Sequence, residues 1–182
     1  MTRTEIALLR GINVGKAKRI AMADLRVLVE GLGYGDVRTL LNSGNVVFTV
    51  PAKVRGDSAA RIEKAIGSEF GFSSRVTVVT ADELATAVAR NPLREAASNP
   101  PRFLVAFLNR PADRTLLAPL AKRKWGKEKL ALGERVAYLW CADGILESEL
   151  LTEVGRVLSD GMTTRNWATV SKLLALSARP PA

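Results

Sequence analysis

Histidine does not occur in this chain of 182 residues, and cysteine occurs once, as Cys141. Without histidine the chain lacks the commonest general base and the commonest metal ligand, so Ser-His-Asp and Cys-His catalytic groupings are excluded. A single cysteine also excludes an internal disulfide. The lack of disulfides is typical of proteins of the reducing cytoplasm, and we expect this protein to be cytoplasmic. Cys141 closes a predicted strand beside Trp140, which indicates a buried thiol and not a reactive one.

Long apolar runs are missing as well. None approaches the roughly 18 residues that span a bilayer, and the first residues lack the apolar core of a signal peptide, so we expect no membrane association. The carboxylates are scattered along the chain without the spacing of metal ligands. We therefore expect neither a metal nor a cofactor, and the sequence favours a binding protein over an enzyme.

Positive charge is what the chain has in excess. Its 27 lysines and arginines outnumber its 18 aspartates and glutamates, which gives a net charge of +9 spread over both halves. Such a balance favours acidic partners, namely nucleic acid, nucleotides or an acidic protein. A basic proteome or a requirement for solubility explains the same balance without any ligand.

The N-terminal half, residues 1–80, alternates in the order βαββαβ. Short apolar runs predict the strands, and apolar residues three or four positions apart predict two helices. Asn42-Ser43-Gly44-Asn45 predicts a tight hairpin turn, because glycine and asparagine tolerate positive φ. This order is that of a ferredoxin-like unit, in which two helices cover one face of an antiparallel sheet. The predicted strands are Thr4–Arg10, Asp36–Asn42, Asn45–Val50 and Arg75–Thr80.

The C-terminal half, residues 102–182, predicts a second unit that is incomplete. A connecting helix and a linker over residues 81–101 precede it. The order is then βαββα, followed by a last helix that Thr163 or Thr164 caps, so the closing strand is missing. The fold class that we predict is α+β, with a ferredoxin-like βαββαβ unit, an incomplete ferredoxin-like βαββα unit and a C-terminal helix. The open edge of the second unit would suit an oligomeric role, and the protein is expected to be a monomer or a homodimer.

The most polar stretch of the chain follows the first strand. A loop with free backbone N–H groups that leads to a helix N-terminus suits anions. In a ferredoxin-like unit this loop and the hairpin turn lie at the same end of the sheet, on neighbouring strands, so we expect them to converge. The predicted ligand-binding residues are Arg10, Gly11, Asn13, Gly15, Lys16 and Lys18 in the loop, and Asn42, Ser43 and Asn45 in the turn.

Both segments also have purely structural explanations. Glycine and asparagine are the residues that tight turns need, and lysines in a loop are commonly only solvated. The loop fits neither familiar nucleotide motif, because three residues separate Gly11 from Gly15, Ala17 follows Lys16, and no GxGxxG pattern occurs.

Two basic features lie in the second half. Arg165, at the predicted start of the last helix, is a further candidate ligand-binding residue, because a guanidinium there can clamp a phosphate or carboxylate; bridging the two halves is its structural alternative. The run Lys122–Lys129 contains Trp125, a pattern that can bind backbone phosphate and stack a base, although such runs are more often solvated helix ends. The predicted strands carry aliphatic residues, which disfavours stacking of RNA on a sheet face.

Three motifs stand out together: Ala7–Gly15 (ALLRGINVG), Asn42–Phe48 (NSGNVVF) and Thr164–Val170 (TRNWATV). Their combination resembles the bacterial domain of unknown function 1697 family, and the resemblance runs nearly from end to end. It implies an α+β fold of ferredoxin-like character and implies no activity. Lys16 stands where the family often has a second glycine.

Together these patterns predict a binding module for a phosphate-bearing ligand, nucleic acid or nucleotide, at the loop and the hairpin turn. One alternative is an enzyme that acts on a small phosphorylated or acyl substrate in the same cleft, which a pocket holding Asn13, Asn42 and a carboxylate would favour. The other is a structural or oligomerisation module.

Overall fold

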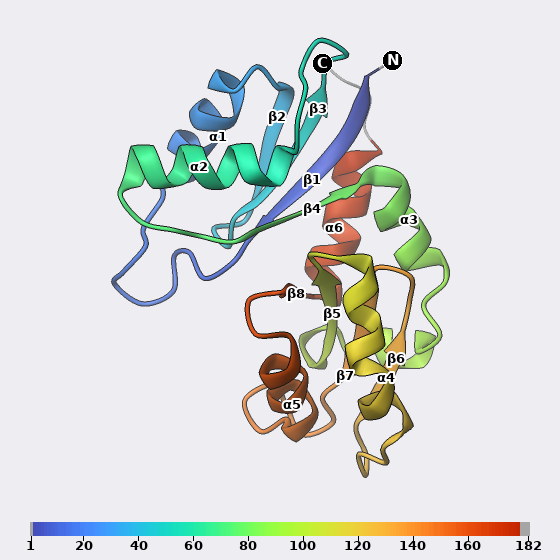
Figure 1. Cartoon of the computed structure of the whole chain (residues 1–182). Helices are drawn as coiled ribbons and strands as arrows, with labels where there is room; N and C mark the ends of the chain where they lie inside the picture. Colours follow the sequence, from blue (N-terminus) through green and yellow to red (C-terminus); the bar gives the residue numbers. More distant parts are fainter. Residues whose placement is uncertain (1, 179–182) are drawn as a thin grey trace. The chain divides into compact units, whose positions relative to one another are not determined.

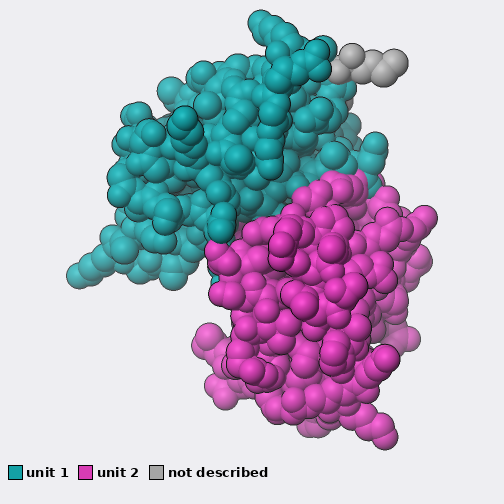
Figure 2. Space-filling model, in the orientation of Figure 1, with its two compact units in different colours: residues 1–82, 173–182 teal, residues 83–172 magenta. Residues whose placement is uncertain are grey.

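The computed structural model describes residues 2–178. Within this part of the chain are two four-stranded antiparallel sheets and six α-helices (Figure 1), so the predicted α+β class is confirmed. The chain divides into two compact units, which Figure 2 colours separately. Unit 1 comprises residues 1–82 and the segment from residue 173 onward, and unit 2 comprises residues 83–172.

The sheet of unit 1 has the strand order β2-β3-β1-β4. The central strand β1 runs antiparallel to both of its neighbours, with Leu8 opposite Asn45 on β3 and Leu9 opposite Val76 on β4. The end of β1 and the starts of β3 and β4 therefore lie at the same end of the sheet. The elements are β1 (Arg3–Leu9), α1 (Met22–Gly31), β2 (Gly35–Leu40), β3 (Asn45–Val50), α2 (Ser58–Phe70) and β4 (Val76–Thr80).

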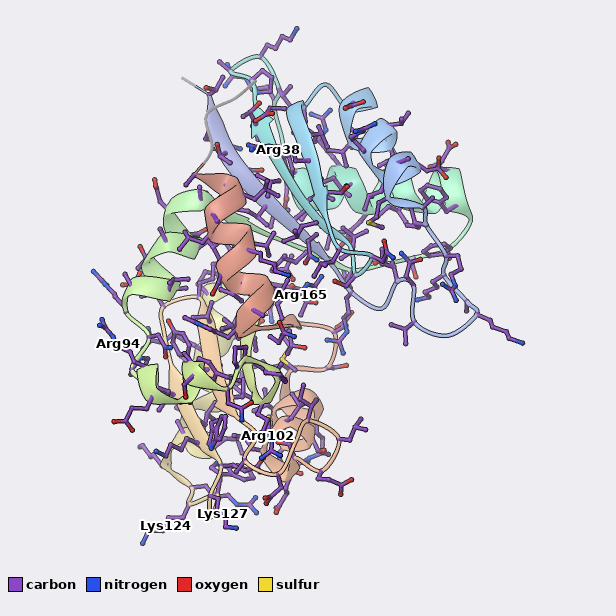
Figure 3. All side chains as sticks on the ribbon, turned by 180° about the vertical axis from the view of Figure 1, so that it is seen from behind. Arg38, Arg94, Arg102, Lys124, Lys127 and Arg165 are labelled. Carbon is purple, nitrogen blue, oxygen red and sulfur yellow. The ribbon has the colours of Figure 1, made fainter. Side chains whose placement is uncertain are left out.

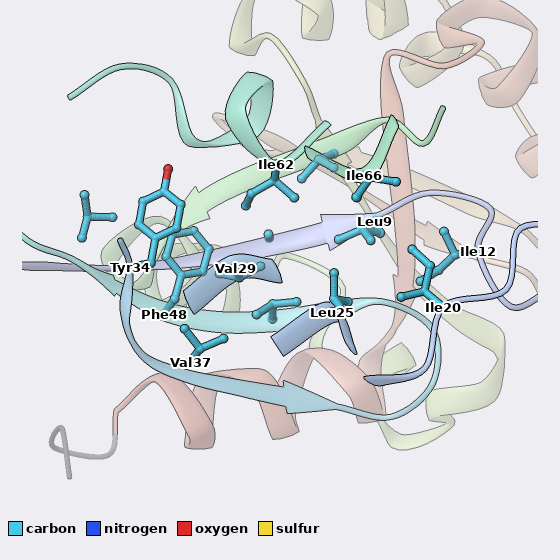
Figure 4. Close-up of a cluster of buried hydrophobic side chains, with 14 residues drawn as sticks. Leu9, Ile12, Ile20, Leu25, Val29, Tyr34, Val37, Phe48, Ile62 and Ile66 are labelled. Atoms are coloured by element: carbon cyan, nitrogen blue, oxygen red, sulfur yellow. The ribbon is translucent and has the colours of Figure 1, made fainter. Parts of the chain in front are cut away.

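The core of unit 1 lies between this sheet and helices α1 and α2 (Figure 4). Burying a Leu or Ile side chain contributes about 1.5 to 3 kcal/mol. Ile12 and Ile20, from the loop between β1 and α1, are buried in the same cluster and anchor that loop to the core. The sheet supplies Leu9 and Phe48, α1 supplies Leu25 and Val29, and α2 supplies Ile62 and Ile66.

Unit 2 contains the second sheet, in the order β6-β7-β5-β8. One face of this sheet packs on helices α4 and α5 through a buried cluster that includes Leu117, Leu150 and Cys141. Cys141 is thus buried, as predicted. The strands are β5 (Phe103–Leu108), β6 (Lys129–Leu132), β7 (Val136–Trp140) and β8 (Met162–Asn166). The helices are α3 (Ala81–Ala89), α4 (Arg114–Lys122), α5 (Glu149–Leu158) and α6 (Trp167–Ser177), with short 3-10 turns at Arg94–Ser98, Pro100–Arg102 and Pro111–Asp113.

The prediction that the second half lacks a closing strand was wrong. Strand β8 pairs antiparallel with β5 along its whole length, from Met162 opposite Leu108 to Asn166 opposite Leu104. The edge of β5 is therefore covered, and the open edge that favoured an oligomeric role does not exist. Backbone pairing with β5 satisfies the N–H and C=O groups of this segment. Its polar side chains alone do not predict a strand.

The predicted helix cap at Thr163 or Thr164 was wrong for the same reason. Both threonines lie within β8, and threonine, as a β-branched residue, favours strands. Helix α6 begins later, at Trp167, and its first turn is capped by Asn166, whose side-chain oxygen accepts a hydrogen bond from Thr169 N at 2.9 Å.

Tyr138 on β7 allows a test of the packing in unit 2. Its hydroxyl donates a 2.7 Å hydrogen bond to the carbonyl of Ala87 on α3. Burial raises the pKa of Tyr138 to about 12. Because this folded-state pKa lies above the unfolded value of about 10, the neutral phenol contributes stability that is complete below pH 10 and declines as the pH rises towards 12.

Tyr138→Phe is expected to lower the free energy of unfolding by about 1 kcal/mol at neutral pH, because the Ala87 carbonyl loses its donor. The difference between wild type and variant should shrink and then reverse as the pH rises from about 10 towards 12, since Tyr138 loses its proton there in the unfolded wild type and keeps it in the folded one. Urea denaturation over this pH range measures both effects. A difference that is the same at every pH would contradict the assignment.

Candidate functional site

The loop between β1 and α1 is held in shape by Asn13. The side-chain Nδ2 donates to the carbonyl of Ile20 at 2.9 Å, and Oδ1 accepts from the backbone N–H of Ile20, also at 2.9 Å. The backbone N–H of Asn13 donates to the carbonyl of Lys18 at 3.0 Å. Asn13 has a φ of 55°, a left-handed conformation that asparagine tolerates better than most residues. Asn13 thus joins the start of the loop to its end at Lys18 and Ile20.

The hairpin turn between β2 and β3 lies against this loop, as we expected from the order of the strands. Asn13 Nδ2 also donates to the carbonyl of Asn42, at 2.7 Å. The carbonyl of Gly44 accepts from the backbone N–H of Leu9 at 2.8 Å. The turn packs closely against the end of β1 and the loop. A Cβ atom added to Gly44 would lie 2.7 Å from Leu9 Cβ and 2.8 Å from Ile12 Cδ1.

Asn45 fixes the hairpin turn from the inside. It is fully buried at the start of β3, and its Nδ2 donates to the carbonyl of Leu40 at 2.8 Å and to the hydroxyl of Ser43 at 2.9 Å. These bonds tie both ends of the turn together. The amide of Asn45 therefore serves the turn and is not presented to solvent.

A third segment, Ser73–Arg75 ahead of β4, also contacts the loop, although none of its residues was among the predicted site residues. Lys18 Nζ donates to the carbonyl of Ser73 at 3.0 Å. Ser74 Oγ donates to the carbonyl of Arg10 at 2.9 Å, and the backbone N–H of Arg10 donates to the carbonyl of Arg75 at 2.9 Å. The signal was available in the predicted topology, because pairing of β4 with β1 places the start of β4 beside the end of β1.

We call residues 10–19, 41–44 and 73–75 together the cationic rim. Arg75 is paired with Glu63 at 3.4 Å. The backbone N–H groups of Lys16, Lys18 and Arg19 donate no hydrogen bond to any residue that the structure describes. The rim therefore combines positive charge with free N–H donors, and both groups attract anions. Its basic residues are Arg10, Lys16, Lys18, Arg19 and Arg75, of which all but the half-buried Arg10 are exposed.

Some of the predicted site residues of unit 1 shape the rim, and others present charge to a ligand. Gly11 and Gly15 have φ values of 68° and 64° and permit the left-handed conformations of the loop. Asn13 and Asn45 use their side-chain amides within the protein, so these four residues shape the rim. Lys16, in contrast, is exposed and offers a point charge to a ligand.

Arg165 lies within β8 of unit 2, so its predicted position at the start of a helix was wrong. The side chain, labelled in Figure 3, is buried, and its Nη1 donates to Thr163 Oγ1 at 3.0 Å and to the carbonyl of Thr164 at 2.8 Å. Burial lowers the pKa of Arg165 to about 10. A buried guanidinium with bonds along its own strand has the surroundings of a structural residue, and its role in ligand binding stays a prediction.

The basic run Lys122–Lys129 does not present an open aromatic ring. The indole N–H of Trp125 donates to a backbone carbonyl of α4 at 2.8 Å. The guanidinium of Arg123 lies over the Trp125 ring, 4.2 Å from its centroid. Lys124 and Lys127 are exposed (Figure 3), so this run offers charge without a free surface for stacking a base.

Residues 2–178 contain no group of cysteine, aspartate and glutamate side chains that could hold a metal ion. Nor does any helix in this part of the chain have the length and apolar character needed to cross a membrane. Burial raises the pKa of the Cys141 thiol, which lowers its thiolate fraction and so its reactivity at neutral pH.

A family model described as "Protein of unknown function (DUF1697)" matches residues 1–138, which include the whole cationic rim. The chain belongs to the DUF1697 family. The match covers residues 1–82 of unit 1, but not its segment from residue 173 onward, and ends within β7 of unit 2. The family assignment predicted from the three sequence motifs is therefore confirmed.

A solved structure similar to this DUF1697 protein is that of the conserved bacterial protein SP0830 from Streptococcus pneumoniae. The two have a TM-score of 0.79 with 20% sequence identity, over 97% of this chain and 99% of the other. At this identity the similarity shows that the two proteins share a fold. A comparison with curated proteins gave no match.

Proposed function

We propose that unit 1 binds a phosphate-bearing ligand, a nucleic acid or a nucleotide, on the cationic rim. One observation carries the proposal: Lys16, Lys18 and Arg19 are exposed on a loop whose shape is fixed, and their backbone N–H groups donate no hydrogen bond within residues 2–178. Donors that are already in place lose little conformational entropy when a ligand binds. Lysine, arginine and backbone N–H groups are common ligands of phosphate.

The charge of the whole chain supports the same proposal. A net charge of +9 raises the local concentration of anions and speeds their association. A reducing cytoplasm, where nucleic acid and nucleotides are abundant, is the compartment that we infer from a single, buried cysteine.

We infer that both units have a ferredoxin-like arrangement, which accounts for the rim. The element order β1α1β2β3α2β4 and the strand order β2-β3-β1-β4 support this for unit 1, as does the core that α1 and α2 form with one face of the sheet. Unit 2 repeats the pattern with β5, α4, β6, β7, α5 and β8 in the strand order β6-β7-β5-β8.

Stabilisation by inorganic phosphate tests the proposed site. Phosphate is expected to raise the melting temperature of the wild type, because a ligand that binds only the folded state stabilises it. In the double variant Lys16→Gln/Arg19→Gln the rise should fall by about half or more, since two of the exposed cations are lost. Differential scanning calorimetry at constant ionic strength measures the shift.

The matched control is Lys53→Gln. Lys53 follows Val50, at the end of β3 that pairs with Arg3, so it lies at the other end of the sheet from the rim. This variant removes the same kind of charge and should keep the full response to phosphate. Equal shifts in wild type, control and double variant would exclude the rim as the phosphate site.

A further inference from the structure

We propose that the ligand of the cationic rim is the sugar-phosphate backbone of double-stranded nucleic acid, bound without reading base sequence. This inference rests on the proposed function of the same rim and narrows its ligand to one class. Three features carry it: the amide of Asn13 is committed to the protein and leaves Asn42 as the exposed amide of the rim, the rim has no stacking surface, and its cations are spread along one loop.

The amide side chains of Asn13, in the rim, and of Asn45, next to it, are already in use, whereas that of Asn42 is exposed. Direct readout of adenine uses an asparagine or glutamine amide that is free to bond the base in the major groove. The Asn13 amide makes three hydrogen bonds, to Ile20 and Asn42, and that of Asn45 bonds to Leu40 and Ser43. Releasing either amide would open the loop or the turn. The rim therefore has several charges but a single exposed amide, that of Asn42, with which to distinguish one base from another.

A stacking surface is also missing from the rim. Residues 10–19, 41–44 and 73–75 contain no Phe, Tyr or Trp. The nearest aromatic residue in the sequence, Phe72, packs against the core of unit 1, and its ring lies 6.3 Å from that of Phe70. The exposed apolar side chains of the rim are Val14 and Leu41, which are aliphatic. Proteins that prefer single strands stack bases on aromatic rings, so this rim favours a duplex.

The spacing of charge points to a polymer and not to a single phosphate group. Lys16, Lys18 and Arg19 lie within one exposed loop, and Lys18 is held in place by its bond to the Ser73 carbonyl while two of its N–H groups stay available. A duplex carries one negative charge per roughly 1.7 Å of its axis, which allows several cations to be neutralised at once. A mononucleotide offers its charge at one end only.

Fluorescence anisotropy with the full chain and labelled DNA of about 20 base pairs tests the inference. Three exposed loop cations predict that log K falls with log salt at a slope of about −2.7, or roughly a fortyfold loss of affinity between 50 and 200 mM salt. Two duplexes of unrelated sequence should bind equally, and either one should bind more tightly than its single strands. Lys16→Gln should reduce the slope by about one for every duplex, whereas Lys53→Gln should leave it unchanged.

Tighter binding of single strands, or a strong preference for one duplex sequence, would overturn the inference. It would also be overturned if phosphate stabilised the protein through Lys16 and Arg19 while duplex DNA bound no more tightly than a mononucleotide. In that case the proposed anion site survives and its assignment to a duplex fails. Absence of both phosphate stabilisation and duplex binding at low salt would reject both proposals together.

Discussion

Gly44→Ala is expected to lower the free energy of unfolding by about 2 to 4 kcal/mol. Two effects add at this position. Gly44 has a φ of 77°, in the left-handed region that costs an alanine about 1 kcal/mol. A Cβ atom would also meet Leu9 Cβ at 2.7 Å and Ile12 Cδ1 at 2.8 Å, both of which belong to the packed core of unit 1. Urea denaturation monitored by circular dichroism measures the loss.

Gly15→Ala is the matched control for this prediction. Gly15 has a similar φ of 64°, but a Cβ atom there would have no neighbour within 4 Å. The control therefore carries the conformational cost of about 1 kcal/mol without the steric clash. If both variants lost the same stability, the close contact between the hairpin turn and the loop would not hold in solution.

Asn13→Ala should have an effect of similar size, about 2 to 4 kcal/mol. The substitution removes three side-chain hydrogen bonds, two with Ile20 and one with the carbonyl of Asn42. It also places alanine at a φ of 55°. Because the loop is no longer closed on itself, the phosphate response of the cationic rim should weaken as well. The same denaturation experiment and the phosphate titration measure the two effects.

Asn13→Gly separates the two contributions. Glycine accepts the left-handed conformation, so this variant loses only the hydrogen bonds and should retain about 1 kcal/mol more stability than Asn13→Ala. Wild-type stability in Asn13→Gly would mean that the side chain does not hold the loop. The phosphate response should be weak in both variants, since both leave the loop open.

The meeting of the loop and the hairpin turn could be predicted because chain order alone determines it. Apolar runs located the central strand and its neighbour, and antiparallel pairing of these strands requires their connecting segments to share one end of the sheet. The roles of Asn13 and Asn45 could not be predicted in this way. Their partners, Ile20 and Leu40 among them, are backbone groups whose positions depend on the left-handed conformations of the loop and turn.

Strand β8 was missed because its own residues give a weak signal. Thr163, Thr164, Arg165 and Asn166 have no alternation of apolar and polar side chains, and threonine ahead of a helical pattern is typical of a helix cap. The segment is a strand because β5 offers it a ladder of backbone hydrogen bonds, a tertiary effect that local propensity does not contain. The symmetry with the first half, in which β4 closes the sheet, was the observation that could have found it.

Unit 1 is built from two separate segments of the chain, and this affects how the chain can fold during its synthesis. This unit takes in residues 1–82 and also the segment from residue 173 onward, whereas unit 2 is continuous in sequence. A ribosome releases all of unit 2 before the last part of unit 1, although most of unit 1 is made first. Domains usually fold as units from the N-terminus. The native contacts of unit 1 are therefore completed only after all of unit 2 has been synthesised.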